Sequence, residues 1–140
     1  MTGRLLSALS ACALVAGCGG AEEAPAPIEG PAIASAQLAG EYRVAGINGS
    51  EIDLAHAITA SIDAERIHLT SDCVNFAWSY RFEGETLVTE RVPVESCARG
   101  YDATEQELLA ALDVADTARR TPANAIEISG GGNAVSLFSQ

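Results

Sequence analysis

The sequence contains no lysine: its eight strongly basic residues are all arginines. The Ser-x-x-Lys motif of serine acyl enzymes is therefore impossible, and none of the serines stands in Gly-x-Ser-x-Gly. Acidic residues outnumber basic ones by 19 to 8, which gives a formal net charge of −11. Because nucleic acid and anionic lipid surfaces attract basic proteins, this balance argues against either as an electrostatic partner.

Histidine and cysteine are also scarce, with two and four residues respectively. His68, Cys73 and Cys97 are the only candidates for a metal site or a Cys/His nucleophilic pair, but no CxxC or HxxxH spacing supports one. His68 alternates with apolar neighbours, which places it on the polar face of a strand. We therefore predict no metal, no cofactor, no catalytic residue and no enzymatic activity.

The N-terminal residues predict export. One positive charge precedes an apolar run that is too short to span a bilayer and that ends in Val-Ala-Gly-Cys at Cys18. This ending resembles the lipobox of bacterial lipoproteins, which implies that residues 1–17 are a signal peptide and that Cys18 is lipidated. An ordinary secretory signal is the alternative. Gly19 rather than Asp follows the cysteine, which favours an outer-membrane lipoprotein facing the periplasm.

Composition then divides the exported chain in two. Residues 18–37 are rich in Gly, Ala, Glu and Pro and show no apolar periodicity, which predicts a flexible tether. Residues 38–140 are enough for one small core, and we expect a single domain there. Loss of Arg4 with the signal peptide changes the net charge from −11 to −12. A charged partner would therefore be basic, although such a charge can simply maintain solubility.

The stretch between Cys73 and Cys97 predicts a hairpin. An apolar residue occupies every second position of its first half, which is the pattern of a half-buried strand, in the row Val74, Phe76, Trp78, Tyr80 and Phe82. Pairing residues whose numbers sum to 170 puts Val88, Val92 and Val94 on the same face and sets the two cysteines opposite each other. A sum of 168 keeps the apolar face but separates the cysteines.

An oxidising compartment makes Cys73 and Cys97 a predicted disulfide, since Cys12 leaves with the signal and Cys18 carries lipid. Two reduced, buried cysteines are the alternative. The aromatic row Phe76, Trp78 and Tyr80 either fills the core, as is usual in a domain this small, or lines a pocket for an apolar ligand.

The remaining pattern predicts antiparallel sheet and one helix. Strands are expected over 38–47, ending at Asn48-Gly49, over 58–62 and 67–70, and in a last hairpin of 125–128 and 134–138 around three glycines. The glycines lead into a strand and not a helix, so we interpret them as a turn. A helix over about 103–117 begins at Asp102 or Thr104, each with glutamate three residues on.

The order of these motifs resembles the META domain of HslJ-like heat-shock lipoproteins. The resemblance rests on Leu38-Ala39-Gly40-Glu41-Tyr42, Ile47-Asn48-Gly49, Cys73-x-x-Phe76-x-x-x-Tyr80, and Cys97 before an acidic helix. Trp78 stands where the family usually has glycine, and Tyr42 where it usually has tryptophan. The resemblance implies a small, mainly β, antiparallel and partly open barrel with one packed helix, in envelope proteins linked to stress tolerance that have no established enzymatic mechanism.

These observations favour a non-catalytic lipoprotein with a structural or binding role in envelope maintenance. One alternative is an acidic inhibitor of a basic, envelope-attacking enzyme such as lysozyme, whose encounter the negative charge would steer. Another is a carrier that holds an apolar ligand against the aromatic row.

Overall fold

The computed structural model describes residues 31, 33, 35–53 and 57–140. The predicted signal peptide, Cys18 and His56 lie outside these residues. The described elements, in chain order, are α1 (Ser35–Leu38), β1 (Gly40–Ile47), β2 (Ser50–Glu51), β3 (Ile58–Ile62), β4 (Arg66–Ser71), β5 (Val74–Glu83), β6 (Thr86–Val92), α2 (Ala103–Asp113), β7 (Thr117–Arg120), β8 (Ile126–Gly130) and β9 (Asn133–Ser139).

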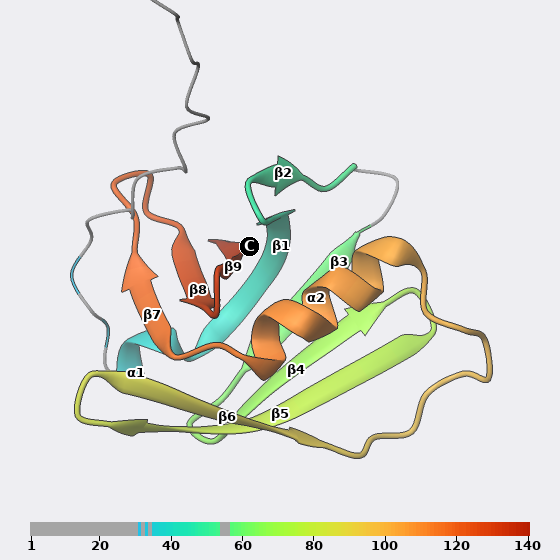
Figure 1. Ribbon diagram of the computed structural model, residues 1–140, viewed down its shortest axis with the longest axis horizontal. Helices are drawn as coiled ribbons and strands as arrows, with labels where there is room; N and C mark the ends of the chain where they lie inside the picture. Colours follow the sequence, from blue (N-terminus) through green and yellow to red (C-terminus); the bar gives the residue numbers. More distant parts are fainter. Residues whose placement is uncertain (1–30, 32, 34, 54–56) are drawn as a thin grey trace, which may run out of the picture.

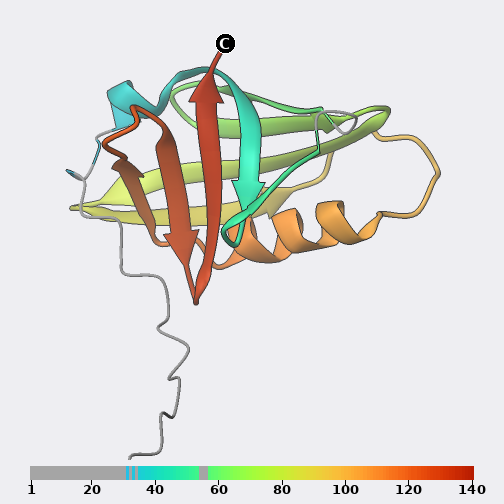
Figure 2. The same ribbon diagram turned by 90° about the horizontal axis from the view of Figure 1, so that it is seen from above.

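The strands form one antiparallel sheet that curls into a nearly closed barrel. Its order is β6-β5-β4-β3-β1-β9-β8-β7, with β2 paired to the end of β1 (Figure 1). Figure 2 shows β7 and the β5–β6 hairpin meeting where the sheet closes on itself. The backbone N–H of Leu87 donates to the carbonyl of Asp116 there, at 2.8 Å. The predicted fold class, a partly open β-barrel with one packed helix, is confirmed.

The barrel interior is built by alternation. The β3 strand is buried at every second residue from Ile58, as the sequence predicts, and β4 and the first part of β5 continue the pattern. In β1 the register shifts between Val44 and Gly46, so that Val44 and Ile47 both face inward despite their odd spacing. The last hairpin turns at Gly131 and Gly132, whose φ angles of 57° and 83° suit glycine. The predicted glycine turn is confirmed.

Helix α2 packs against β1, β6, β8 and β9 and fills the open side of the barrel (Figure 1). Its start is confirmed: the Asp102 side chain accepts from the backbone of Glu105, and the Glu105 side chain accepts from the backbone of Asp102. The predicted end at 117 is wrong, because α2 stops at Asp113. Beyond it, the N–H of Asp116 donates to Ser129, so this backbone already belongs to the sheet. Strand β7 follows directly and was not predicted.

The predicted register of the β5–β6 hairpin is also wrong. The observed pairs sum to 169, as in Trp78 with Arg91 and Phe82 with Leu87, and Glu83 pairs with Thr86 across a two-residue turn. The shift of one position turns Leu87 into the core and leaves Val88, Val92 and Val94 partly or fully exposed. After Leu87, the residues on the same face of β6 are the half-buried Thr89 and the exposed Arg91, whose polar groups bond to α2.

Packing begins before residue 38, within the predicted tether. Ile33 is 5% exposed, and its N–H donates to the carbonyl of Ala118 in β7. The carbonyl of Pro31 accepts from Arg120 in the same strand. Pro31 and Ile33 therefore make backbone hydrogen bonds along the outer edge of β7, and Leu38 at the end of α1 is fully buried.

Candidate functional site

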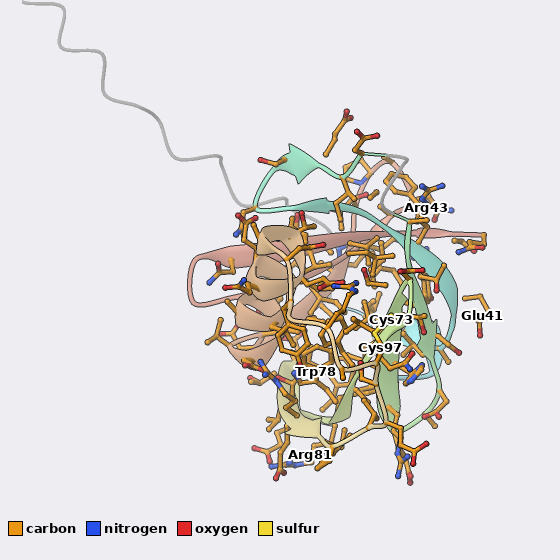
Figure 3. All side chains as sticks on the ribbon, turned by 90° about the vertical axis from the view of Figure 1, so that its right-hand side faces the viewer. Glu41, Arg43, Cys73, Trp78, Arg81 and Cys97 are labelled. Carbon is orange, nitrogen blue, oxygen red and sulfur yellow. A yellow bond between two sulfur atoms is a disulfide. The ribbon has the colours of Figure 1, made fainter. Side chains whose placement is uncertain are left out.

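The two cysteines predicted to pair lie at disulfide distance, with 5.6 Å between their Cα atoms. Figure 3 shows Cys73 and Cys97 side by side, to the right of helix α2 in this view. The N–H of Cys97 also donates to the carbonyl of Cys73, at 3.2 Å. The chain between Val92 and Cys97 is consequently held at both ends, by the β5–β6 ladder and by the cysteine pair.

This held segment encloses a pocket. Strand β6 ends at Val92, and Pro93 has no N–H with which to extend the ladder. Residues 93–96, which we call the strap, leave the strand and rejoin β5 through side-chain bonds. Asn75 Nδ2 donates to the carbonyl of Glu95, and Ser96 Oγ accepts from the backbone N–H of Asn75, each at 3.0 Å.

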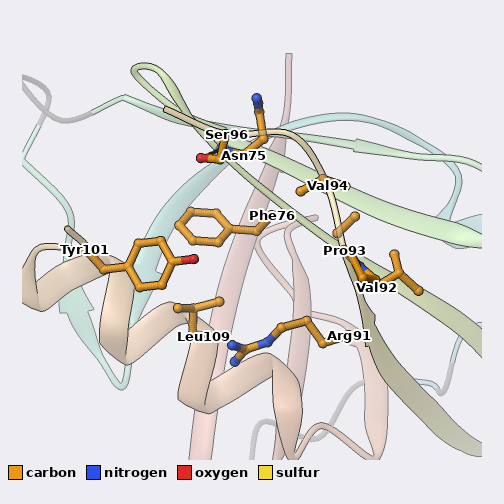
Figure 4. A pocket seen from close by; sticks show the side chains of 10 residues that line it. Asn75, Phe76, Arg91, Val92, Pro93, Val94, Ser96, Tyr101 and Leu109 are labelled. Carbon is orange, nitrogen blue, oxygen red and sulfur yellow. Dashed lines mark hydrogen bonds between the residues drawn. The ribbon is translucent and has the colours of Figure 1, made fainter. Parts of the chain in front are cut away.

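The strap pocket, of about 160 Å³, opens between the strap and the start of α2. Figure 4 shows the rings of Phe76 and Tyr101 on one side, Leu109 of α2 beneath them, and the strap opposite. The centroids of the two rings are 5.3 Å apart, in a tilted arrangement. Phe76 is 3% exposed, whereas Tyr101 is 48% exposed and Val94 38%. The pocket thus has an apolar, buried floor and an aromatic rim.

The aromatic row predicted from the sequence is divided by the structure. Trp78 has no exposed surface and Tyr80 only 6%, and both belong to the core cluster. Phe76 alone of the three lines the strap pocket. The Tyr80 hydroxyl donates to the carbonyl of Asp63 at 2.6 Å, and burial together with the nearby Asp63 carboxylate raises the pKa of Tyr80.

Arg91, at one end of the pocket, is fixed by an ion pair. Its guanidinium donates to both carboxylate oxygens of Asp113, the last residue of α2, and lies 5.8 Å from the ring centroid of Trp78. Asp113 Oδ1 also accepts from the indole Nε1 of Trp78, at 2.9 Å. Because the Asp113 carboxylate offsets the positive charge of the Arg91 guanidinium, Arg91 forms a fixed wall of the pocket with little net charge.

A second ion pair holds the chain that carries Tyr101. Arg99 makes two hydrogen bonds to the carboxylate of Glu105, of 2.6 and 2.9 Å, and Glu105 is fully buried. The Arg99 guanidinium, assisted by the backbone N–H of Asp102, lowers the pKa of Glu105 to about 2 against the opposing effect of burial. Tyr101 is thereby positioned between two anchored residues.

The other predicted residues give no site. His68 is exposed on β4, on the polar face as predicted. Among the described residues, no group of three or more His, Cys, Asp or Glu side chains is arranged to hold a metal ion. In the same part of the chain, no helix has the length and apolarity required to cross a bilayer.

Sequence reasoning missed both Tyr101 and the strap. A proline inside an apparent strand is a signal for an interrupted ladder, and Pro93 carried that signal. Nothing in the sequence indicated that Tyr101, some 25 residues from Phe76, would meet it across the opening.

A scan against protein-family models, a search of curated proteins and a search of solved structures each return no match for this chain.

Proposed function

We propose that this protein is an exported, lipid-anchored and non-catalytic binding domain of a bacterial outer membrane, facing the periplasm. The observation that carries the proposal is the pairing of Cys73 with Cys97 at disulfide distance behind a leader that ends at Cys18 in a lipobox-like sequence. A disulfide persists in an oxidising compartment, and the acylation that a lipobox directs takes place on an exported chain. The cysteine pair and the lipobox-like leader therefore both support export from the cytoplasm.

The strap pocket supports binding over catalysis. Its lining combines aromatic and aliphatic side chains with the polar Asn75 and Ser96, and its charged member, Arg91, is already paired with Asp113. A general acid or base needs an ionisable group within reach of a substrate, and the lining contains no carboxylate, histidine or cysteine. A preformed opening with fixed walls suits recognition, since little ordering is required on binding.

A role in envelope maintenance or stress tolerance is part of the proposal and rests on the resemblance to META domains. The inhibitor alternative is favoured by one observation, the net charge of −12 after export. A carrier built on Trp78 and Tyr80 would have to displace core side chains, because both rings are buried.

The first test is lipid attachment. Cells expressing the full chain are labelled with a palmitate analogue, and the protein is followed by membrane fractionation and by mass spectrometry of its N-terminus. We expect label on the wild type, a new N-terminus at Cys18, and loss of label in Cys18→Ser. A soluble, unlabelled wild-type protein would refute the anchor.

The second test is capture of partners. The wild-type protein is cross-linked in intact cells, isolated, and its bound proteins and lipids are identified, with Tyr101→Ala as the matched control. A partner lost in the control supports binding through the strap pocket. A basic enzyme that is inhibited in a salt-dependent way would favour the inhibitor alternative.

A further inference from the structure

We propose that the strap pocket takes an aromatic side chain of a partner polypeptide in which a positive charge stands beside the ring. This inference rests on the proposed binding function and specifies its ligand. Three features of the pocket carry it: its size, its rim, and the free carboxylate on the strap.

The size of the pocket selects a single ring. A cavity of about 150 Å³ is large enough for benzene, and the strap pocket, which is open on one side and lined by polar as well as apolar groups, measures about 160 Å³. Phe76 and Leu109 provide an apolar floor, and Tyr101 offers a ring edge or face to a second ring. A fused or longer ligand would extend beyond the walls.

The rim indicates a macromolecule. Tyr101 and Val94 are two of the large apolar side chains that the described chain exposes, and both border the same opening. Exposed tyrosine around a small apolar pocket is typical of a protein interface, where a partner covers the rim as its anchor fills the centre. A free ligand of one ring would leave this rim in water.

Charge selects the flanking residues of the partner. Glu95 is an exposed strap residue beside the lining residues Val94 and Ser96 but outside the lining itself, and its carboxylate forms no ion pair within the described residues. Arg91 does not oppose a cation, because Asp113 balances it. The net charge of −11 adds a general attraction for a basic segment. An anionic segment would be repelled by Glu95 and by the net negative charge.

The test compares four probes against the full chain, purified in a non-ionic detergent. Three are end-blocked, dye-labelled peptides with the central sequences Arg-Phe-Arg, Arg-Ala-Arg and Glu-Phe-Glu. Their binding is followed by fluorescence anisotropy at two salt concentrations. The fourth is 2-phenylethylamine, a free ring with one positive charge, which competes with the first peptide.

We expect Arg-Phe-Arg to bind with a dissociation constant of about 10 µM to 1 mM, as suits a single small anchor, and to weaken as salt is raised. It should bind at least about tenfold more tightly than either other peptide. The free amine should compete only at concentrations about tenfold higher than the peptide requires.

Two variants locate the site, and each has a matched control. Tyr101→Ala should weaken Arg-Phe-Arg about tenfold or more, whereas Phe138→Ala, which removes another exposed aromatic ring on β9, should not. Glu95→Gln should weaken it about two- to fivefold, as an exposed ion pair allows, whereas Glu107→Gln on α2 should not. Thermal melting confirms that every variant is folded.

Equal binding of Arg-Phe-Arg and Arg-Ala-Arg would overturn the proposal, because the ring would then contribute nothing. Tight binding of Glu-Phe-Glu would overturn the role of Glu95. An amine as potent as the peptide would make this a small-molecule site. Failure of all four probes together with normal palmitate labelling would refute the ligand and leave the anchored domain intact, so the two proposals fail separately.

Discussion

The indole Nε1 of Trp78 donates a hydrogen bond of 2.9 Å to Oδ1 of Asp113, which ties the middle of β5 to the last residue of α2. The relationship places a carboxylate at the C-terminus of a helix, where the helix dipole disfavours it. Arg91 compensates by pairing with the same carboxylate, and the three residues connect β5, β6 and α2.

Replacing Asp113 with Ala should lower the free energy of unfolding by about 1–3 kcal/mol. The fully buried Trp78 N–H would lose its acceptor, and Arg91 its partner. Relief of the helix-dipole repulsion offsets this by less than about 1 kcal/mol. Urea unfolding measures the change, with the exposed Glu107→Ala as control. Equal stability of the Asp113 variant and the control would show that the network is dispensable.

Removing the cysteine pair should have a larger effect. The two cysteines are separated by 24 positions in the sequence. For a loop of that length the chain-entropy model predicts that the disulfide raises the free energy of unfolding by about 3.5 kcal/mol. Unfolding of Cys73→Ser/Cys97→Ser, compared with wild type with and without reductant, measures it. We expect wild type in reductant to match the double variant.

Thiol counting checks the bridge itself. Under the proposed export and lipidation, Cys12 leaves with the signal and Cys18 is acylated, so denatured, unreduced wild-type protein from the envelope should label no free thiol. Two labelled thiols per chain would contradict the disulfide.

Glu105 should make stability depend on acid pH. Its pKa in the folded state is about 2, against 4.5 for the ordinary group, so its contribution is complete above pH 4.5 and is lost as pH falls toward 2. At 1.36 kcal/mol per pKa unit, the full effect is about 3 kcal/mol. Denaturation of wild type and Glu105→Gln across pH 2 to 7 measures it.

We expect the stability difference between wild type and Glu105→Gln to shrink as pH is lowered through this window. Glu107→Gln, an exposed carboxylate on the same helix, should instead follow the wild-type profile. A constant difference between wild type and the Glu105 variant at every pH would rule out the ion pair with Arg99 as its origin.

Gly130 should tolerate no side chain. A Cβ at this position would lie 2.1 Å from the carbonyl oxygen of Val114, where the end of α2 crosses β8. We expect Gly130→Ala to destabilise by about 2–3 kcal/mol, because backbone has to move. At Gly100 a Cβ meets nothing within 4 Å, so Gly100→Ala should stay within about 0.5 kcal/mol of wild type. Thermal or urea unfolding of both variants measures the two changes in stability, and equal stability of the two would contradict the prediction.

Short-range patterns in the sequence were sufficient for much of this fold. The alternation in β3 and β4, the Asn48-Gly49 turn, the capping box at Asp102 and the cysteine pairing each depend on neighbouring residues or on simple counting. Such features have a period or a geometry that a few residues define, and tertiary context left them unchanged.

Other features depended on contacts between distant segments. The β5–β6 register placed Thr89 and Arg91 on the face of β6 toward α2, where they bond to a carbonyl and a carboxylate of that helix, an arrangement that hydrophobic alternation cannot indicate. The short β7 strand exists because the sheet supplies hydrogen-bond partners for its backbone groups. The same reason explains why Pro31 and Ile33 bond to β7.

The candidate site follows the same division. The sequence by itself determined the inward position of Phe76 and the pairing of Cys97 with Cys73, whereas the strap that begins at Pro93 was not predicted. Only the tertiary structure decided that Trp78 would be sealed beneath α2 and that Tyr101 would stand over Phe76. The reason is physical: a pocket is the space left when elements from different parts of the chain pack together, and no local pattern specifies that space.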